Sequence, residues 1–178
     1  MYRAREKRST TARSTHRLPP GARIACAVST YHEDVTGEML ASALEALGEM
    51  GVERESVLVV PCPGAFELPL VARRLAQRKD VVAVLCFGLV LKGETEHDRY
   101  ISEACAHGLT QVALETDTPV LFGVLTCANL EQARERARSE SEGGQDKGRE
   151  VALAALESLA ALRAAEEGVK KGSGKRAR

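Results

Sequence analysis

Apolar residues follow two alternating patterns along this chain. Continuous apolar runs, of which the longest covers residues 81–91 and is broken only by Gly88, are typical of strands covered on both faces of a parallel sheet. Between these runs, apolar residues recur every three or four positions, as in helices that bury one face. We predict strands at 23–29, 57–60, 82–89 and 120–125, and helices at 34–50, 66–77, 97–115, 129–138 and 147–166.

Strands and helices that alternate with short links favour parallel pairing and right-handed crossovers. The fold predicted from this order is a three-layer α/β/α sandwich with a four-stranded parallel sheet. We expect one domain over residues 21–167 between two disordered basic tails, 1–20 and 168–178, because both ends are short of apolar residues. The run at 81–91 is too short to span a bilayer, so no membrane partner is expected.

A formal charge of zero hides an uneven distribution. Residues 1–20 carry six Arg or Lys against one Glu, and residues 168–178 carry five with no acid, which leaves the body with a charge of about −10. Basic tails are able to contact nucleic acid, membrane or an acidic partner, and the first also has a faint resemblance to an organelle transit peptide. Solvated tails without a partner are the favoured interpretation, and nucleic acid is not an expected ligand.

Five cysteines lie mostly within apolar segments and show no CxxC spacing: Cys26, Cys62, Cys86, Cys105 and Cys127. This pattern indicates small buried side chains in a reducing compartment, so we expect a cytoplasmic protein without disulfides. No Cys, His and carboxylate cluster has metal-ligand spacing, and neither GxGxxG nor GxxxxGK[ST] occurs. We therefore expect no metal.

Residues 92–97, Lys-Gly-Glu-Thr-Glu-His, join the longest apolar run to a predicted helix. The start of a helix presents free N–H groups and a positive dipole, which suit a phosphate or carboxylate, and His97 adds a group that titrates near neutral pH. The alternative is an ordinary turn in which Thr95 caps the helix and His97 is exposed and inert. The hexapeptide alone leaves both interpretations open.

In parallel α/β sheets, ligands bind beyond the carboxyl ends of the strands. This rule selects the loops at 30–32, 61–67, 89–97 and 126–129. Tyr31 offers a ring that stacks on a heterocycle, and residues 63–67 place open backbone amides before Phe66 and Glu67. The alternatives are that Phe66 belongs to the core and that Glu67 only complements a helix dipole.

Five segments in the same order resemble the 6,7-dimethyl-8-ribityllumazine synthase family, over about residues 23–165. They are Pro-Gly-Ala-Phe-Glu-Leu-Pro (63–69), Lys-Gly-Glu-Thr-Glu-His (92–97), Phe-Gly-Val-Leu-Thr (122–126), Leu-Glu-Gln-Ala-Arg-Glu-Arg-Ala (130–137) and Lys-Gly-Arg-Glu (147–150). The resemblance implies a flavodoxin-like fold and a cofactor-free transferase of riboflavin biosynthesis. Its two small-molecule substrates would be 5-amino-6-ribitylaminouracil and 3,4-dihydroxy-2-butanone 4-phosphate, condensed to the lumazine, phosphate and water.

The resemblance also implies site residues by position. His97 would be the catalytic proton donor, and Arg136 would reach the phosphate from the adjoining subunit, so that sites lie at the interfaces of a homo-oligomer. The other substrate contacts, for the pyrimidine and its ribityl chain, the base pocket, the phosphate and the reacting groups, would be Tyr31, Ala65, Phe66, Glu67, Leu89, Val90, Leu91, Glu94, Thr95 and Phe122.

Several positions depart from the family pattern. Tyr31-His32 replaces the more usual Phe-Asn, Lys92 stands where Arg is usual, and Glu96 precedes the histidine where a smaller residue is frequent. The resemblance implies that the chain forms pentamers, which in some family members pack into a larger shell. Here the link at 138–146 is longer and more acidic than usual, which predicts an isolated pentamer or at most paired pentamers instead of a shell. Two alternatives to an active enzyme are a non-catalytic flavin- or lumazine-binding paralogue and a scaffold whose basic tails recruit acidic cargo.

Overall fold

The computed structural model describes residues 18–173. Its strands are β1 (Arg23–Ser29), β2 (Val57–Cys62), β3 (Val81–Leu91) and β4 (Val120–Cys127). Its helices are α1 (Glu33–Glu49), α2 (Leu68–Ala76), α3 (His97–Thr116), α4 (Leu130–Ala137) and α5 (Lys147–Ser173), with short 3₁₀ turns η1 (Arg54–Ser56), η2 (Ala65–Glu67) and η3 (Glu140–Glu142). The predicted disorder of residues 1–17 and 174–178 lies outside the described residues.

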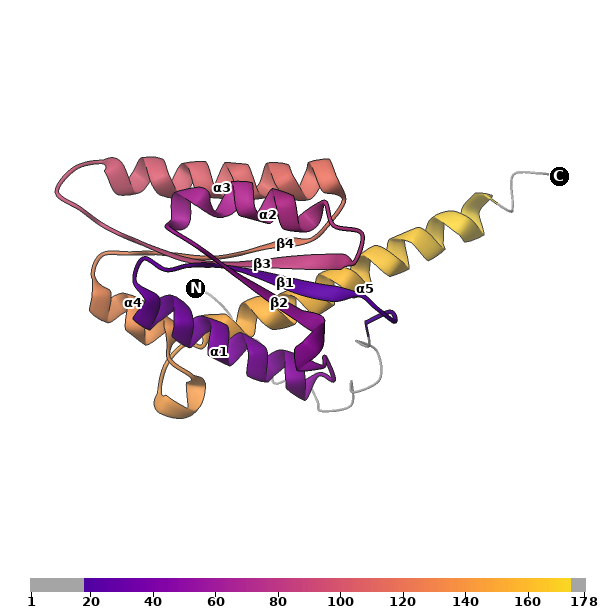
Figure 1. Cartoon of the computed structure of the whole chain (residues 1–178), viewed down its shortest axis with the longest axis horizontal. Helices are drawn as coiled ribbons and strands as arrows, with labels where there is room; N and C mark the ends of the chain where they lie inside the picture. The colour runs from indigo at the N-terminus through magenta and orange to yellow at the C-terminus, as the bar shows by residue number, and fades with distance from the viewer. Residues whose placement is uncertain (1–17, 174–178) are drawn as a thin grey trace, which may run out of the picture.

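All four strands are parallel and lie in the order β2-β1-β3-β4. This is the flavodoxin-like order with one strand fewer. In Figure 1, α2 and α3 cover one face of the sheet, and α1, α4 and α5 cover the other. The predicted three-layer α/β/α fold with a four-stranded parallel sheet is therefore confirmed.

The sheet is apolar on both faces because each face supports its own core. Side chains of alternate strand residues pack either against α1 and α5, as Ile24 and Phe87 do, or against α2 and α3, as Ala25 and Cys86 do. A strand covered on both sides has no polar face to alternate with its apolar one. This explains why the runs are continuous, as β3 is over eleven residues.

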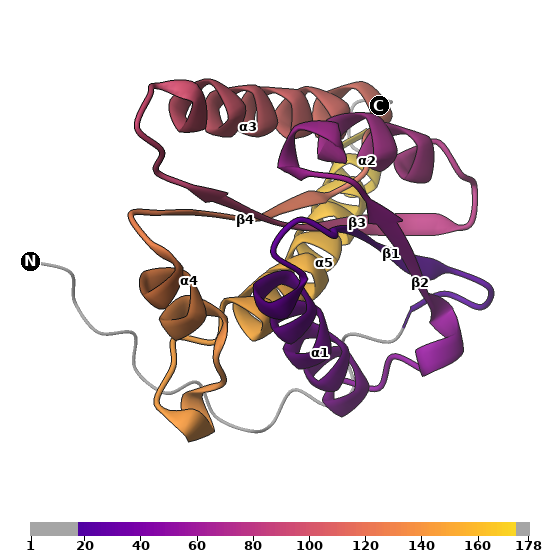
Figure 2. The same cartoon turned by 60° about the vertical axis from the view of Figure 1, so that its left-hand side comes forward.

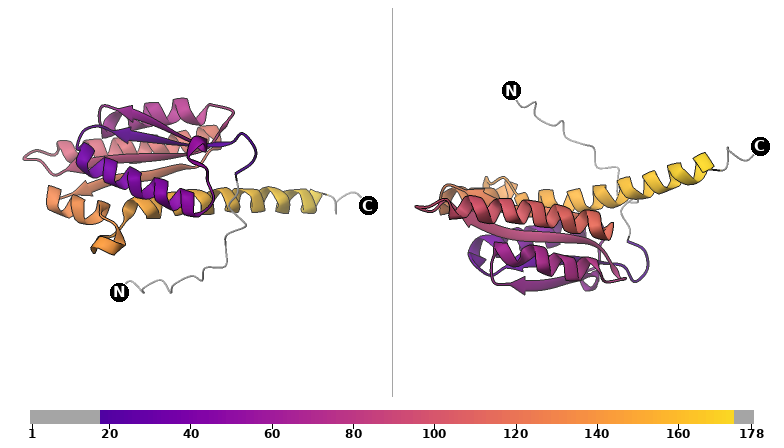
Figure 3. Two further views of the ribbon diagram at one scale, coloured as in Figure 1. Left: turned by 60° about the horizontal axis from the view of Figure 1, so that its bottom comes forward. Right: turned by 90° about the horizontal axis from the view of Figure 1, so that it is seen from above.

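Several predicted boundaries were wrong: β2, β3 and β4 each end two residues later than predicted, and two helices differ more instructively. The helix predicted at 66–77 begins as the 3₁₀ turn η2 and becomes α-helical only at Leu68, directly before Pro69, whose fixed φ suits a first helical turn. Helix α5 runs past residue 166 to Ser173, into the segment expected to be a tail. Its end is rich in Ala, Glu and Lys, which favour helix, and it projects beyond the sheet (Figure 3).

The Lys-Gly-Arg-Glu segment at 147–150 locks α5 to α1. A Cβ on Gly148 would lie only 2.1 Å from the carbonyl oxygen of Met39, so the two helices cross here at backbone contact. Arg149 donates to Glu49 at 2.6 Å, and the buried Asp146 caps α5 by accepting from the Arg149 N–H at 3.1 Å. Asp146 also accepts from the Ser42 hydroxyl of α1, so this segment contributes to the packing of α5 against α1.

Candidate active site

The loops selected from the sequence meet at one edge of the sheet. The four strands end there, and α1, α2, α3 and α4 begin there, at the left of Figure 1. Backbone hydrogen bonds join neighbouring loops: the Thr30 N–H donates to the Cys62 carbonyl at 2.8 Å, and the Lys92 N–H donates to the Cys127 carbonyl at 2.9 Å. The edge is therefore a preformed surface on which several loops hold fixed positions.

For a parallel α/β sheet, the fold rule places the ligand crevice at this edge, where β1 and β3 part. Pairing between them ends at Val28 and Phe87, whereas β3 continues beside β4 until Leu91 pairs with Cys127. The chain leaves β1 toward α1 and leaves β3 toward α3 on the opposite face, which makes this the topological switch point of the sheet. Beyond Phe87, the side of β3 that faces β1 has backbone groups that pair with no residue of β1.

Residues 89–91 were expected to line a base pocket. The structure buries the side chain of Leu89 in the core beside α1, where Leu91 also packs, and buries Val90 in the core beside α2 and α3. Successive strand residues point to opposite faces, so these side chains cannot all face one ligand. What this segment offers at the crevice is its backbone N–H and C=O groups.

Two aromatic rings stand exposed beside the crevice. Tyr31 is 67% exposed and Phe66 is 60% exposed, so the interpretation of Phe66 as a core residue is wrong. Their loops are tied together because the Tyr31 N–H donates to the Pro63 carbonyl at 3.2 Å. A flat heterocycle bound beside these two loops, which follow β1 and β2, would find both rings available for stacking.

The turn η2 packs against α3, which supports it. Ala65 is buried, and its carbonyl accepts from the Cys105 thiol at 2.9 Å, a contact that the spacing of the cysteines did not predict. Burial, together with the negative charge of Glu67, raises the pKa of the Cys62 and Cys105 thiols to about 11. Both thiols therefore stay protonated near neutral pH, and Cys105 remains a donor that supports the turn.

The loop at 92–97 is exposed at Lys92, Glu94, Thr95 and His97. His97 is the first residue of α3, and its N–H donates to the Thr95 hydroxyl at 3.4 Å. The N-cap of α3 is Glu96 and not Thr95, and no side-chain hydrogen bond caps the helix within residues 18–173, so the expectation that Thr95 caps it is wrong. The imidazole of His97 is accessible at the carboxyl end of β3, so the structure is compatible both with a proton carrier and with an exposed, inert side chain.

Arg136 lies on α4, whose start and end are both fixed. The Asn129 side chain accepts from the Gln132 N–H at 2.9 Å, and the Gln132 side chain accepts from the Ala128 N–H at 2.8 Å, as in a capping box. Arg136 is half-buried and donates to the Gln132 carbonyl at 3.2 Å. Burial raises the pKa of the Cys127 thiol and the charge of Arg136 opposes that rise, which places the guanidinium near the end of β4.

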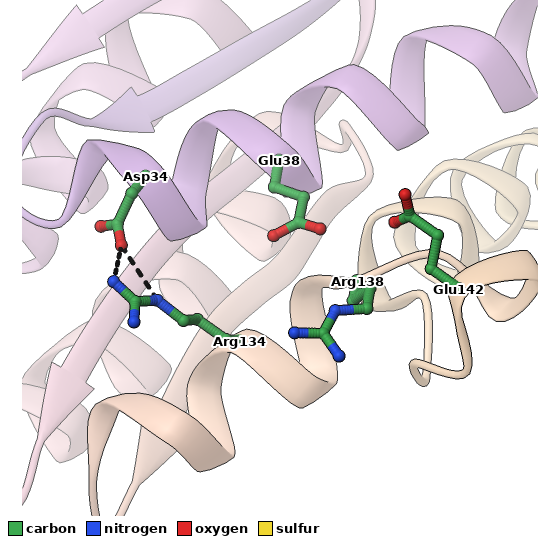
Figure 4. Close-up of a pocket in the computed structure, with 5 residues that line it drawn as sticks. All are labelled: Asp34, Glu38, Arg134, Arg138 and Glu142. Carbon is green, nitrogen blue, oxygen red and sulfur yellow. Dashed lines mark hydrogen bonds and ion pairs between the residues drawn. The ribbon is translucent and has the colours of Figure 1, made fainter.

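Charged side chains face one another between α4 and α1. Arg134 pairs with Asp34 at 2.9 Å, and Figure 4 shows Arg138 on the same side of α4, facing Glu38 of α1, with Glu142 of η3 nearby. The Arg134 guanidinium lowers the pKa of Asp34, whereas burial and the charge of Glu142 raise that of Glu38. Within residues 18–173, Arg136 forms no ion pair. It differs in this from Arg134, whose guanidinium pairs with the carboxylate of Asp34.

Phe122 is not brought together with the other predicted site residues. It pairs with Cys86, which pairs with Ala27 of β1, so Phe122 lies two strands, about 10 Å, across the sheet from β1. Tyr31 follows Ala27 by four residues, up to about 13 Å further toward the carboxyl edge. Phe122 is 46% exposed on the outermost strand of the sheet. Within one chain, Phe122 and Tyr31 cannot contact the same small molecule.

The described residues add two further findings. Among residues 18–173, no group of three or more His, Cys, Asp or Glu side chains is arranged to hold a metal ion. No helix in this part of the chain is long and apolar enough to cross a membrane.

These features define an α/β protein of flavodoxin-like topology whose candidate small-molecule site lies at the switch point of a parallel sheet. The family model described as 6,7-dimethyl-8-ribityllumazine synthase matches residues 21–163. Two relatives, from two strains of Thermus thermophilus and each named 6,7-dimethyl-8-ribityllumazine synthase, are 46% identical to this chain over 144 residues, which is 81% of this chain and 90% of each relative. The chain belongs to the 6,7-dimethyl-8-ribityllumazine synthase family, as the motifs in its loops predicted.

Proposed function

We propose that this chain condenses 5-amino-6-ribitylaminouracil with 3,4-dihydroxy-2-butanone 4-phosphate to give 6,7-dimethyl-8-ribityllumazine, phosphate and water. The observation that carries this function is the family match, which spans 21–163 and includes all the loops at the carboxyl edge. A cytoplasmic location agrees with five free, buried cysteines, since reducing compartments keep thiols unpaired.

The pyrimidine substrate fits the crevice between β1 and β3. Tyr31 and Phe66 supply exposed rings for stacking, and the backbone of residues 89–91 supplies donors and acceptors for the edge of the heterocycle. Ala65 and Glu67, in the turn that Cys105 supports, hold the ribityl chain. The ring is thereby placed with its amines toward the loop that begins α3.

The phosphorylated substrate binds beside that loop. Glu94 and Thr95 surround the phosphate together with open N–H groups at the start of α3, and Arg136 supplies a planar, permanently charged fork. An amine of the pyrimidine adds to the ketone, phosphate leaves, and the second amine closes the ring. His97 carries the protons that these steps exchange. Much of the acceleration comes from holding two reactive substrates together.

The site is completed by a neighbouring subunit. Phe122 lies too far from Tyr31 within one chain, yet it is exposed on the edge strand β4 beside a groove between α3 and α5. Leu114 and Leu162 border this groove and are also exposed, so a second copy packed there would bury them and bring its own loops to Phe122. Arg136 reaches the adjoining site by the same packing.

The expected assembly is a homopentamer, isolated or at most paired. Turn η3 projects below α4 and α1 (Figure 2) and carries exposed Glu140 and Glu142, which would bring like charges together if pentamers met there. Light scattering should then give a particle of about 95 kDa, five chains of 19.1 kDa each. A particle of roughly sixty subunits would overturn this assignment.

Mixing two impaired variants tests the shared site. His97→Ala and Arg136→Ala subunits, denatured together and refolded at equal amounts, should form rings in which about a quarter of the sites carry both native residues. Activity should then exceed the mean of the two parent variants. The control is a mixture of the same two variants assembled separately. If co-refolded rings are no more active than this control, each chain holds its whole site and the interface proposal is wrong.

A second candidate function is a non-catalytic binding protein that holds a flavin or lumazine in the same crevice. Tyr31-His32 and Glu96, which depart from the family pattern, favour it. The presence of both His97 and Arg136 favours the enzyme, because a binding protein needs neither a proton carrier nor a cation that binds the phosphate.

A further inference from the structure

His32 occupies a backbone conformation that few side chains adopt. Its φ of 64° and ψ of 49° lie in the left-handed region, at the residue that precedes α1. Histidine is among the non-glycine residues found there more often than average, whereas bulky or branched residues are rare. Left-handed residues outside glycine are worth explaining when they stand beside a functional site.

The surrounding backbone holds this conformation in place. On one side, the Tyr31 N–H donates to the Pro63 carbonyl at 3.2 Å. On the other, the His32 carbonyl accepts from the Val35 N–H at 3.0 Å and from the Thr36 N–H at 3.1 Å. Bonds on both sides therefore fix the turn, and α1 starts from it.

The left-handed turn brings two neighbouring rings together. In an extended strand, the side chains of residues 31 and 32 would point to opposite faces. Here the ring centroids of Tyr31 and His32 lie 4.5 Å apart with an interplanar angle of 66°, an edge-to-face contact. Aromatic rings favour this geometry over a parallel sandwich. Tyr31 is 67% exposed, so its ring is largely in solvent and the contact with His32 limits the rotation of that ring.

We infer that His32 is a positioning residue for pyrimidine binding: its imidazole edge holds the Tyr31 ring in the orientation that stacks on the heterocycle. The inference rests on the proposed function, in which Tyr31 is the stacking ring. A ring already held in place loses less rotational freedom when the ligand binds, so His32 raises affinity for the pyrimidine. It contributes neither to phosphate binding nor to proton transfer, which belong to the loop after β3.

Two substitutions remove the ring and keep the turn. Glycine and asparagine both tolerate left-handed backbone, so His32→Gly and His32→Asn should fold normally. We expect each to raise the KM for the pyrimidine substrate about two- to tenfold, the size of one aromatic pair, with kcat and the KM for the phosphorylated substrate unchanged. The matched control is Asp117→Gly, which makes the same kind of change at another left-handed residue, after α3, and should not reproduce the selective rise in the KM for the pyrimidine substrate.

A double-mutant cycle separates this inference from the proposed function. Tyr31→Leu alone should raise the pyrimidine KM, and adding His32→Gly to it should cause no further rise, because the ring that His32 holds is gone. If Tyr31→Leu weakens binding but His32→Gly does not, His32 has no positioning role and the proposed stacking stands. If Tyr31→Leu has no effect, the stacking itself is wrong, and the inference falls with it. A fall in kcat for His32→Gly at constant KM would overturn the inference by placing His32 in the chemistry.

Discussion

Gly148→Ala should destabilise the fold, although helix propensity predicts the opposite. The new Cβ would lie 2.1 Å from the Met39 carbonyl oxygen and 2.9 Å from the Met39 Cα, and both are backbone atoms of α1 that cannot rotate away. Alanine is favoured over glycine in a helix by about 1 kcal/mol, whereas forcing extra volume into a packed core costs about 1–3 kcal/mol. Because α1 or α5 must move as a whole, we expect the cost at the upper end of this range and a net loss of about 2 kcal/mol.

Gly37→Ala is the matched control. Gly37 also lies in a helix, α1, but a Cβ there would meet nothing within 4 Å. Helix propensity is then the only effect of the substitution, and it should stabilise the fold by up to about 1 kcal/mol. The assay is urea denaturation of both variants and the unsubstituted protein at one protein concentration, since assembly adds to apparent stability. The midpoint should fall for Gly148→Ala and rise for Gly37→Ala. A Gly148→Ala midpoint at or above that of the unsubstituted protein would refute the close crossing of α1 and α5.

Three further predictions concern the site. His97→Ala should lower kcat by roughly 10²-fold or less and leave the KM for the pyrimidine unchanged. Arg136→Ala should chiefly raise the KM for the phosphorylated substrate. Steady-state kinetics with each substrate varied in turn would show the reverse pattern if the two roles were exchanged. Turnover should survive exhaustive chelation, and a loss restored by a divalent ion would contradict a mechanism without metal. Cys105→Ala should remove one of the two donors to the Ala65 carbonyl, which also accepts from the Leu68 N–H, and should cost about 0.5–1.5 kcal/mol in a denaturation assay. Cys105→Ser should retain most of the stability, and equal losses in the two variants would mean that the thiol only fills space.

The layers of the fold and the position of the site could be predicted from the sequence because both follow from local patterns. The apolar run at 81–91 coincides with β3, and the rule that ligands bind at the carboxyl ends of strands selected the loops that meet there. His97 was placed at a helix start from the change of period after Gly93, and it is the first residue of α3. Such features depend on residues close together in the chain.

Long-range contacts were beyond prediction. A strand buried on both faces shows no alternation, so the pattern could not reveal that Leu89 and Val90 point to opposite cores. The bond from Cys105 to Ala65 joins residues forty positions apart, and a buried cysteine resembles any other small apolar residue in sequence. The separation of Phe122 from Tyr31 depends on strand register, which apolar patterns leave undetermined when both faces are buried.

The most direct test of the account is to mix the purified protein with both substrates and follow lumazine absorbance and fluorescence together with phosphate release. An active synthase should produce lumazine and phosphate in equal amounts, at a rate that rises with enzyme concentration and falls in His97→Ala. Binding of the pyrimidine without formation of lumazine above the uncatalysed rate would contradict the account and identify the chain as a binding protein.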